Sequence, residues 1–359
     1  MTHNRHRASE GAELHILAAG DHFVSPGLLA GAVRAELGGG HEVAELTLPW
    51  PVEPFGPVGN VLEASGTEDQ VIEALAGAEA VVTQMAPFTK KVFAAAPALK
   101  LVSVCRGGPV NVDLAAATEA GVAVTYAPGR NAGAAAEFAV GMILAAMRRI
   151  STSSAELLAG TWRGDYYAYD QAGLELGGTT VGLVGYGAIG SRVTKVLVAF
   201  GANVLVADPY ADRAAVAADG AQLVELDELL RQSRVVSLHA RLTEETRHLI
   251  NASKLDLLPE GAVLVNTARG GLLDYAPLPD ALRSGRLGAL ALDVYDVEPP
   301  PADWALRDAP NVIATPHLAG ASRQTAERAA AIVAAEVGRY ARGEQLANLA
   351  NPEVLERRP

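Results

Sequence analysis

An apolar run, a glycine-rich turn and an amphipathic stretch follow one another near the middle of the chain. The turn contains three glycines, Gly185, Gly187 and Gly190, in the pattern G-x-G-x-x-G. A second apolar run follows the amphipathic stretch and ends at Asp208, 23 residues after Gly185. This order of strand, turn, helix, strand and acidic residue is typical of a fold that binds a dinucleotide.

Each residue of this pattern has a physical task. Gly185 permits a tight turn, Gly187 lets backbone amides approach a pyrophosphate, and Gly190 permits close packing of the helix on the strand. The N-terminus of the helix presents free N–H groups to the phosphates. The Asp208 carboxylate can accept hydrogen bonds from ribose hydroxyls and repels a 2′-phosphate, and the nearest arginine that follows it is Arg213. We therefore predict NAD, rather than NADP, as the cofactor.

Composition narrows the class of protein further. The 359 residues include 29 basic and 41 acidic side chains, for a net charge of −12. This acidity argues against a nucleic-acid partner, because phosphate contacts need clustered Lys and Arg. A single cysteine, Cys105, excludes a disulfide framework and a cysteine-rich zinc module, and we expect no metal site.

Neither a membrane segment nor a secretory signal is expected. The apolar stretch Ala132–Met147 is interrupted by Glu137 and is shorter than the roughly 20 residues that a membrane helix needs. The first residues, Met1 to Glu13, contain no apolar core after their arginines. We therefore expect a cytoplasmic protein in which residues 1–12 are disordered.

Short apolar runs alternate with amphipathic stretches along most of the chain, as in parallel α/β proteins. In the first part we expect strands at Leu14–Ala18, Val43–Leu48, Ala80–Thr83, Leu99–Val104 and Val122–Tyr126. In the second part we expect them at Thr180–Val184, Val204–Ala207, Val235–His239, Val263–Asn266, Ala289–Asp293 and Val312–Ala314. Long helices are expected at Ala134–Ile150 and Ser322–Arg342, and the proline-rich stretch Pro49–Gly59 is expected to be a loop.

Three polar motifs follow expected strands, at the edge where an open α/β sheet binds its ligand. They supply a cation, Arg269, a carboxylate, Glu298, and an imidazole, His317. Hydride transfer from a hydroxyl-bearing carbon to a nicotinamide needs a base for the hydroxyl proton, and a cation can bind an acidic group of the substrate. His317 suits the first role with Glu298 to orient it, and Arg269 can fork onto carboxylate and carbonyl oxygens. Each residue alone could be an ordinary loop residue, but their combination with a dinucleotide pattern favours catalysis.

With these motifs, the chain resembles the D-isomer-specific 2-hydroxyacid dehydrogenases, and within them the 3-phosphoglycerate dehydrogenase-like branch. The resemblance runs from about Ala80 to Asn351 and is most specific at Gly-Tyr-Gly-Ala-Ile-Gly, Asn-Thr-Ala-Arg-Gly-Gly and Thr-Pro-His. It implies an α/β fold of two Rossmann-like, doubly wound parallel-sheet domains. The NAD-binding domain, residues 129–317, would be inserted into a flavodoxin-like substrate domain of residues 1–128 and 318–359.

The resemblance also implies a homodimeric, NAD-dependent oxidoreductase that moves a hydride between nicotinamide and C2 of a 2-hydroxy or 2-oxo acid. At His239 the chain reads His-Ala-Arg where the family often has His, an apolar residue and Pro, so a structural role and a cofactor contact are equally open. Besides the glycines and Asp208, the implied cofactor contacts are Ala188, Ile189, Thr267, Ala268, Asp293, which would meet the carboxamide, and Gly320.

The loop that binds the substrate carboxylate in this family is altered here. The family pattern is Arg-Ala-Gly-Val-Gly-x-Asp-Asn-Val-Asp, whereas Cys105–Asp113 is two residues shorter between its arginine and asparagine. We expect this loop to hold an anionic substrate through Arg106 and through the backbone amides of Gly107 and Gly108, which could form an anion-binding nest. Arg130 is expected to lie nearby. Two arginines on loops of an acidic protein predict a second anionic group, such as phosphate or phosphonate, unless they pair with surface acids.

Two other functions remain open from the residues alone. Relatives of this family serve as NAD(H)-sensing transcriptional corepressors, which would make the chain an interaction protein on the same fold. A formate- or phosphite-oxidising relative is the second alternative. The complete set of Arg269, Glu298 and His317 favours the dehydrogenase, and turnover of a 2-oxo acid with NADH would discriminate between them.

Overall fold

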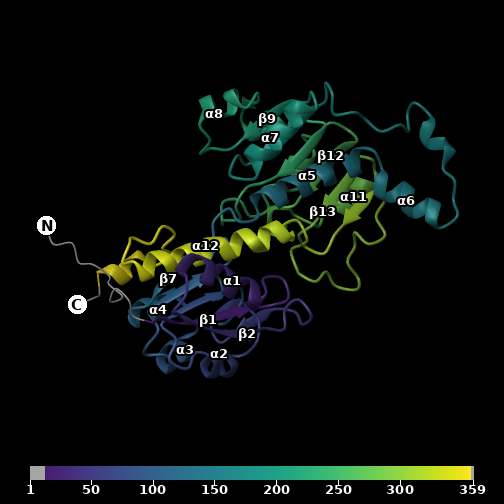
Figure 1. Cartoon of the computed structure of the whole chain (residues 1–359). Helices are drawn as coiled ribbons and strands as arrows, with labels where there is room; N and C mark the ends of the chain where they lie inside the picture. Colours follow the sequence, from purple (N-terminus) through teal and green to yellow (C-terminus); the bar gives the residue numbers. More distant parts are fainter. Residues whose placement is uncertain (1–12, 357–359) are drawn as a thin grey trace. The chain divides into compact units, whose positions relative to one another are not determined.

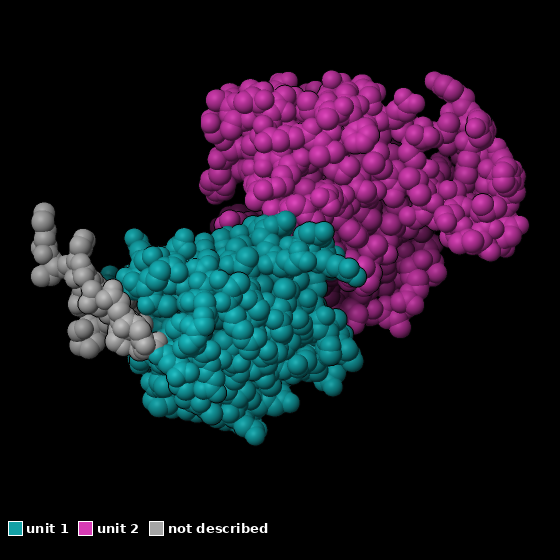
Figure 2. Space-filling view, in the orientation of Figure 1, with its two compact units in different colours: residues 1–130, 321–359 teal, residues 131–320 magenta. Residues whose placement is uncertain are grey.

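The computed structural model describes residues 13–356, so the expected disorder of residues 1–12 concerns a segment outside the described part. The chain divides into two compact units, which Figure 2 colours separately. Unit 1 contains the residues up to Arg130 together with those from Ala321 onward, and unit 2 contains Asn131–Gly320.

Unit 1 is built on a five-stranded parallel sheet in the order β2-β1-β5-β6-β7. Its strands are β1 (His15–Gly20), β2 (Glu42–Thr47), β5 (Ala80–Thr83), β6 (Leu101–Val104) and β7 (Ala123–Tyr126). Its helices are α1 (Pro26–Leu37), α2 (Glu68–Ala74), α3 (Lys90–Ala95), α4 (Leu114–Glu119) and α12 (Arg323–Ala341), with a short 3₁₀ turn, η3 (Pro352–Leu355). The helices α1 and α12 pack side by side over one face of the sheet, and α2, α3 and α4 pack on the other (Figure 1).

The strand register of unit 1 aligns the loops that leave the carboxyl edge of its sheet. Ala19 of β1 pairs with Thr83 of β5, Thr83 pairs with Val104 of β6, and Val104 pairs with Tyr126 of β7. Because all four strands run parallel, the residues that follow them leave the sheet next to one another.

The expectation that Pro49–Gly59 is only a loop is wrong at its end. A short antiparallel hairpin, β3 (Gly56–Val58) and β4 (Val61–Ala64), begins inside this stretch, with an irregular register between its strands. Pro57 is tolerated there because both strands of a two-stranded hairpin are edge strands. Proline has no N–H to donate, and a position on an edge strand does not need one when it faces away from the partner strand.

Unit 2 contains a seven-stranded parallel sheet in the order β10-β9-β8-β11-β12-β13-β14. Its strands are β8 (Thr180–Val184), β9 (Asn203–Ala207), β10 (Gln222–Leu223), β11 (Val235–Leu238), β12 (Ala262–Asn266), β13 (Leu287–Leu292) and β14 (Val312–Ala314). Its helices are α5 (Ala132–Met147), α6 (Ile150–Leu158), α7 (Gly190–Ala199), α8 (Arg213–Ala218), α9 (Leu226–Gln232), α10 (Ala252–Leu255) and α11 (Leu278–Arg283), with 3₁₀ turns η1 (Gly164–Tyr167) and η2 (Gly270–Leu272).

The two faces of this sheet bury separate apolar clusters. One cluster lies under α5, α7 and α8, and the other lies under α9, α10 and α11. Strands covered on both faces read as continuous apolar runs, which is why their positions are legible in the sequence. The order of the strands brings the residues after β8, β11, β12, β13 and β14 to one edge of the sheet.

The long helix expected at Ala134–Ile150 is α5, which begins two residues earlier and ends at Met147. The chain turns at Arg149, whose φ of 54° separates α5 from a second helix, α6. No side chain of α6 is buried, and the segment from residue 150 to residue 174, which we call the arm, projects from unit 2 (Figure 1).

Within residues 13–356, no helix is both long and apolar enough to cross a bilayer.

Candidate active site

The glycine-rich turn after β8 has the geometry that its sequence predicts. Gly185 has a φ of +104°, and a Cβ on it would lie 2.6 Å from the backbone nitrogen of Ala240. A Cβ on Gly190 would lie 2.2 Å from the carbonyl oxygen of Gly185, so α7 begins in close contact with the turn. Around Gly187 no atom lies within 4 Å of such a Cβ, which leaves the turn open for a phosphate.

Asp208 lies directly after β9 and faces the same turn. Its Oδ2 accepts a hydrogen bond from the backbone N–H of Tyr186 at 2.7 Å, and its Oδ1 accepts one from Tyr210 at 2.9 Å. Each oxygen keeps a lone pair, so the carboxylate can still accept bonds from ribose hydroxyls. Arg213 donates from Nη1 to the carbonyl oxygen of Leu223 at 3.2 Å and is thus engaged with the strand β10.

His239 joins the turn to the neighbouring strand. Its backbone N–H donates to the carbonyl oxygen of Val184 at 2.7 Å, and its Nε2 lies 3.0 Å from Oγ of Ser237. Burial lowers the pKa of His239 to about 4, so the imidazole is neutral at neutral pH. These contacts support the structural role, and the cofactor contact stays a prediction.

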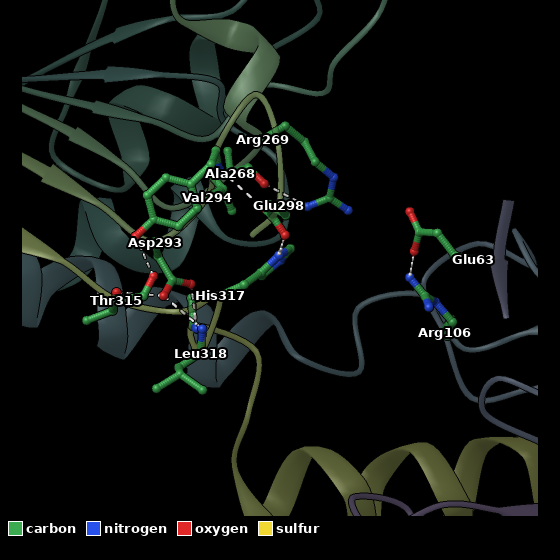
Figure 3. Close-up of polar contacts among 12 residues, drawn as sticks. Glu63, Arg106, Ala268, Arg269, Asp293, Val294, Glu298, Thr315, His317 and Leu318 are labelled. Atoms are coloured by element: carbon green, nitrogen blue, oxygen red, sulfur yellow. Dashed lines mark hydrogen bonds and ion pairs between the residues drawn. The ribbon is translucent and has the colours of Figure 1, made fainter. Parts of the chain in front are cut away.

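Glu298 and His317 form a hydrogen-bonded pair, drawn in Figure 3. Nδ1 of His317 donates to Oε2 of Glu298 at 2.7 Å, while Oε1 accepts from the backbone N–H of Tyr295 at 3.0 Å. Burial alone would raise the pKa of Glu298, but the hydrogen bond and charge of His317, the N–H of Tyr295 and the charge of Arg269 lower it below its ordinary value. The carboxylate therefore stays ionised at neutral pH beside the imidazole.

The backbone at His317 is in the left-handed region, with a φ of 54°, which is unfavourable for a residue other than glycine. The buried carboxylate of Asp293 holds the segment around it. Its Oδ1 accepts from Oγ1 of Thr315 at 2.7 Å and from the N–H of Leu318 at 2.8 Å, and its Oδ2 accepts from the N–H of Ala319 at 2.7 Å. Asp293 thus fixes the segment that carries His317, in addition to the cofactor contact expected of it.

Arg269 lies on the loop after β12, next to the pair (Figure 3). The buried side chain of Asn266 braces this loop, because its Nδ2 donates to the carbonyl oxygen of Arg269 at 2.8 Å and its Oδ1 accepts from the N–H of Ala268 at 3.1 Å. A Cβ on Gly270 would lie 1.8 Å from the carbonyl oxygen of Tyr295, so this loop packs directly on the segment before Glu298. No role of its own was expected for Asn266, although a polar residue at the end of an apolar strand is a signal for such a brace.

The remaining expected cofactor residues surround the same sheet edge of unit 2. Thr267 is buried, and its Oγ1 has no hydrogen-bond partner among the described residues. Ala188 is exposed and Ile189 is half-buried at the start of α7. A Cβ on Gly320 would lie 2.9 Å from Nδ2 of Asn131.

Between residues 13 and 356, no cluster of three His, Cys, Asp or Glu side chains could hold a metal ion.

In unit 1, Arg106 is already paired. Its Nη2 forms an ion pair with Oε2 of Glu63 (Figure 3), and its Nη1 lies 3.1 Å from the sulfur of Met85. The sequence left two roles open for Arg106, namely binding a second anionic group of the substrate and pairing with an acidic side chain. In the structure Arg106 pairs with an acidic side chain. Gly107 and Gly108 have open space around them, but neither has a positive φ, so the expected nest of αR and αL residues is not formed.

Arg130 keeps a free donor. Its Nη1 is buried and has no hydrogen-bond partner in the described part of the chain, and burial lowers the pKa of the guanidinium. Its backbone carbonyl accepts a hydrogen bond from Nη1 of Arg328 in α12 at 2.6 Å, which fixes the main chain at this position.

Comparison with known proteins adds independent information. The model of the family described as D-isomer specific 2-hydroxyacid dehydrogenase, NAD binding domain, matches residues 140–319. A glyoxylate reductase of Korarchaeum cryptofilum is 36% identical over 298 residues, which cover 83% of this chain and 90% of that protein. A D-3-phosphoglycerate dehydrogenase of Methanocaldococcus jannaschii is 38% identical over 298 residues, but the match spans only 56% of its length.

A solved structure extends the similarity to the fold. The apo-structure of D-lactate dehydrogenase from Escherichia coli superposes with a TM-score of 0.75 at 27% sequence identity. The alignment covers 93% of this chain and 99% of the other. Both units therefore belong to the compared fold, and not the NAD-binding part alone.

The geometry of the Glu298–His317 pair predicts how Glu298 titrates. In a His317→Ala variant the carboxylate stays buried but loses the hydrogen bond and charge of the imidazole, so we expect the pKa of Glu298 to rise. Carbon-13 NMR of glutamate carboxyl groups measures this titration, and a Glu298→Gln variant identifies the resonance. An unchanged or lowered pKa would contradict the pairing.

Proposed function

Since the chain belongs to the D-isomer specific 2-hydroxyacid dehydrogenase family, we propose that it catalyses NAD-dependent oxidation or reduction at C2 of a 2-hydroxy or 2-oxo acid through Arg269, Glu298 and His317. The observation that carries the proposal is the 2.7 Å pair of His317 and Glu298 beside Arg269. It occurs at the sheet edge that also holds the glycine-rich turn. A complete acid–base pair at this edge favours an enzyme over an NAD(H)-sensing interaction protein.

The residues of unit 2 fit the cofactor. The open turn at Gly187 and the N-terminus of α7 suit a pyrophosphate, and Asp208 suits a ribose with free hydroxyls. When bound, NAD supplies the nicotinamide C4 that accepts or returns the hydride.

His317 moves the proton. Because Nδ1 is held by Glu298, Nε2 is the nitrogen left to exchange a proton with the substrate. In oxidation the hydroxyl proton passes to Nε2 while the hydride leaves C2, and in reduction Nε2 returns the proton to the carbonyl oxygen. The ionised Glu298 stabilises the imidazolium that forms in the first case.

Arg269 binds the reacting end of the substrate. Its guanidinium can donate to a carboxylate oxygen and to the oxygen on C2 together, which fixes C2 relative to His317. The brace by Asn266 and the close contact of Gly270 limit the movement of this loop. A positioned cation of this kind also stabilises negative charge on the substrate oxygen during hydride transfer.

The sequence predicts a substrate with a phosphate or phosphonate group from two arginines, Arg106 and Arg130. Only one of them supports this prediction in the structure. Arg106 pairs with Glu63, so Arg130 alone remains to hold a second anionic group. The turnover of matched substrates with and without this group decides the point.

We also propose that two copies of the chain associate through the arm. Large apolar side chains on it are exposed, including Leu158 at 87% and Trp162 at 82%. An apolar patch of this kind on a water-facing segment is typical of a protein interface. A second copy is the partner that the family resemblance implies.

Replacing His317 with alanine should lower kcat by about two to four orders of magnitude, the usual contribution of general acid–base catalysis. Binding of NADH, followed by its fluorescence, should persist. His15→Ala is a matched control, because Nδ1 of His15 pairs with Oε2 of Glu42 at 2.8 Å on the strands of unit 1. Near-normal turnover by His317→Ala, measured with a panel of 2-oxo acids, would refute the assignment.

Replacing Asp208 with alanine should narrow the preference for NAD over NADP by roughly tenfold, an effect of about 1.4 kcal/mol, because it removes the repulsion of the 2′-phosphate. The ratio of kcat/KM for the two cofactors measures this. Asp212→Asn, which changes a nearby acidic N-cap residue, serves as the control. A preference of the unmodified protein for NADP would instead point to Arg213.

The double variant Leu158→Asp, Trp162→Glu should shift the protein from dimer to monomer, because charges replace the apolar side chains of the arm. Light scattering coupled to gel filtration measures the mass. Val52→Asp is a matched control, since Val52 is 77% exposed but lies in unit 1. A dimer that survives the double variant places the interface elsewhere.

A further inference from the structure

The glycine-rich turn of unit 2 carries one side chain that can form hydrogen bonds. Between Gly185 and Gly190 the chain reads Tyr-Gly-Ala-Ile, so Tyr186 is the only polar residue of the turn. It is half-buried against the apolar cluster under α5, α7 and α8. Its hydroxyl donates to Oδ2 of Asp219 at 2.6 Å, and the carbonyl oxygen of Ala215 lies 3.3 Å from the same hydroxyl. The turn is thus joined to the carboxyl end of α8.

Asp219 is bound from two sides. It is the C-cap residue of α8, and its Oδ1 lies 3.4 Å from Nζ of Lys195 in α7. The lysine is largely exposed, so water weakens this ion pair and the phenol is the stronger partner. Burial, together with the hydrogen bond and the charge of Asp219, raises the pKa of Tyr186 to about 12. The phenol therefore keeps its proton at neutral pH and remains the donor.

The same tyrosine holds Asp208 through its backbone. The N–H of Tyr186 donates to Oδ2 of Asp208 at 2.7 Å. Tyr186 therefore binds both ends of the segment from Asp208 to Asp219, which contains the loop after β9 and the whole of α8. The first end is the carboxylate that suits the ribose of the cofactor, and the second end is eleven residues further along the chain.

The helix α8 has few contacts of its own to hold it. It contains six residues, and within Arg213–Ala218 only Val216 is buried. A helix this short is marginal in water, so its position depends on contacts with the rest of the unit. Arg213 ties its start to β10, and the phenol of Tyr186 ties its end to the turn. Loss of the second contact would free α8 and, with it, the loop that begins at Asp208.

We propose that Tyr186 is a positioning residue for the cofactor, which sets the affinity for NAD and the discrimination against NADP by holding α8 through Asp219 and so orienting the carboxylate of Asp208. A carboxylate accepts from two ribose hydroxyls only when its oxygens point toward both of them. NADP gains no such bonds, because the same carboxylate repels its 2′-phosphate. A poorly oriented Asp208 therefore weakens the binding of NAD more than that of NADP.

Tyr186→Phe tests this difference, because it keeps the ring and the backbone N–H and removes only the hydroxyl. We expect the Kd for NADH, measured by its fluorescence, to rise about three- to tenfold, the size that one hydrogen bond contributes. The Kd for NADPH should change less, so that the ratio of the two falls. A general loosening of the unit would weaken both cofactors alike. An unchanged ratio therefore overturns the inference, whether both affinities fall together or neither does.

Variants of Asp219 test whether the phenol acts through this carboxylate. Asp219→Ala should reproduce the effect of Tyr186→Phe, and it serves if the first variant does not fold. Asp219→Asn keeps an oxygen that accepts from the phenol and should retain most of the affinity for NADH. The double variant of Tyr186→Phe with Asp219→Ala should bind NADH no more weakly than either single variant, because both remove one bond. Additive losses in the double variant overturn the inference.

Asp280→Ala is the matched control for these variants. Asp280 pairs with Arg283 at 3.1 Å on the surface of α11, in the same unit. Its loss removes an acidic side chain and an ion pair without touching the turn, so the affinity for NADH should not change.

Hydrogen exchange of the protein without cofactor tests the step from the bond to the helix. In Tyr186→Phe we expect the amides of α8 to exchange faster. The amides of α9, which packs on the other face of the sheet, should exchange as before. Unchanged exchange in α8 overturns the inference. Neither binding nor exchange needs turnover, so failure of the proposed function, seen as absent turnover with NADH bound, is a separate result.

Discussion

The conformation of the acid–base pair depends on one buried carboxylate. Three hydrogen bonds, from Thr315, Leu318 and Ala319, satisfy the two oxygens of Asp293. These bonds hold the segment of His317 against the end of β13. Since β12 is the neighbouring strand, the same edge carries the loop of Arg269. A buried carboxyl group with hydrogen bonds to both of its oxygens thus holds the geometry of the site.

The fold class and family could be predicted because their signals are local. Strands buried on both faces read as apolar runs, and the three strands expected at Ala80–Thr83, Thr180–Val184 and Val312–Ala314 have those bounds in the structure. The glycine-rich turn is likewise legible, because Gly185 and Gly190 stand where any side chain would collide with backbone. The comparisons confirm the family and NAD as its cofactor.

What the sequence did not reveal depends on contacts between distant residues. Arg106 and Glu63 are 43 positions apart, and nothing local indicates that they pair. The break between α5 and α6 rests on the single left-handed residue Arg149 within an otherwise helical pattern.

The left-handed backbone of His317 implies a compromise between stability and chemistry. A residue other than glycine held in such a conformation costs of the order of 1–3 kcal/mol, a sizeable share of the 5–15 kcal/mol by which a typical protein is stable. Position 317 is therefore occupied by an imidazole in spite of its backbone, and glycine would be the better residue for folding. Thermostable variants selected for folding alone would drift away from histidine at this position, and selection for turnover is what retains it.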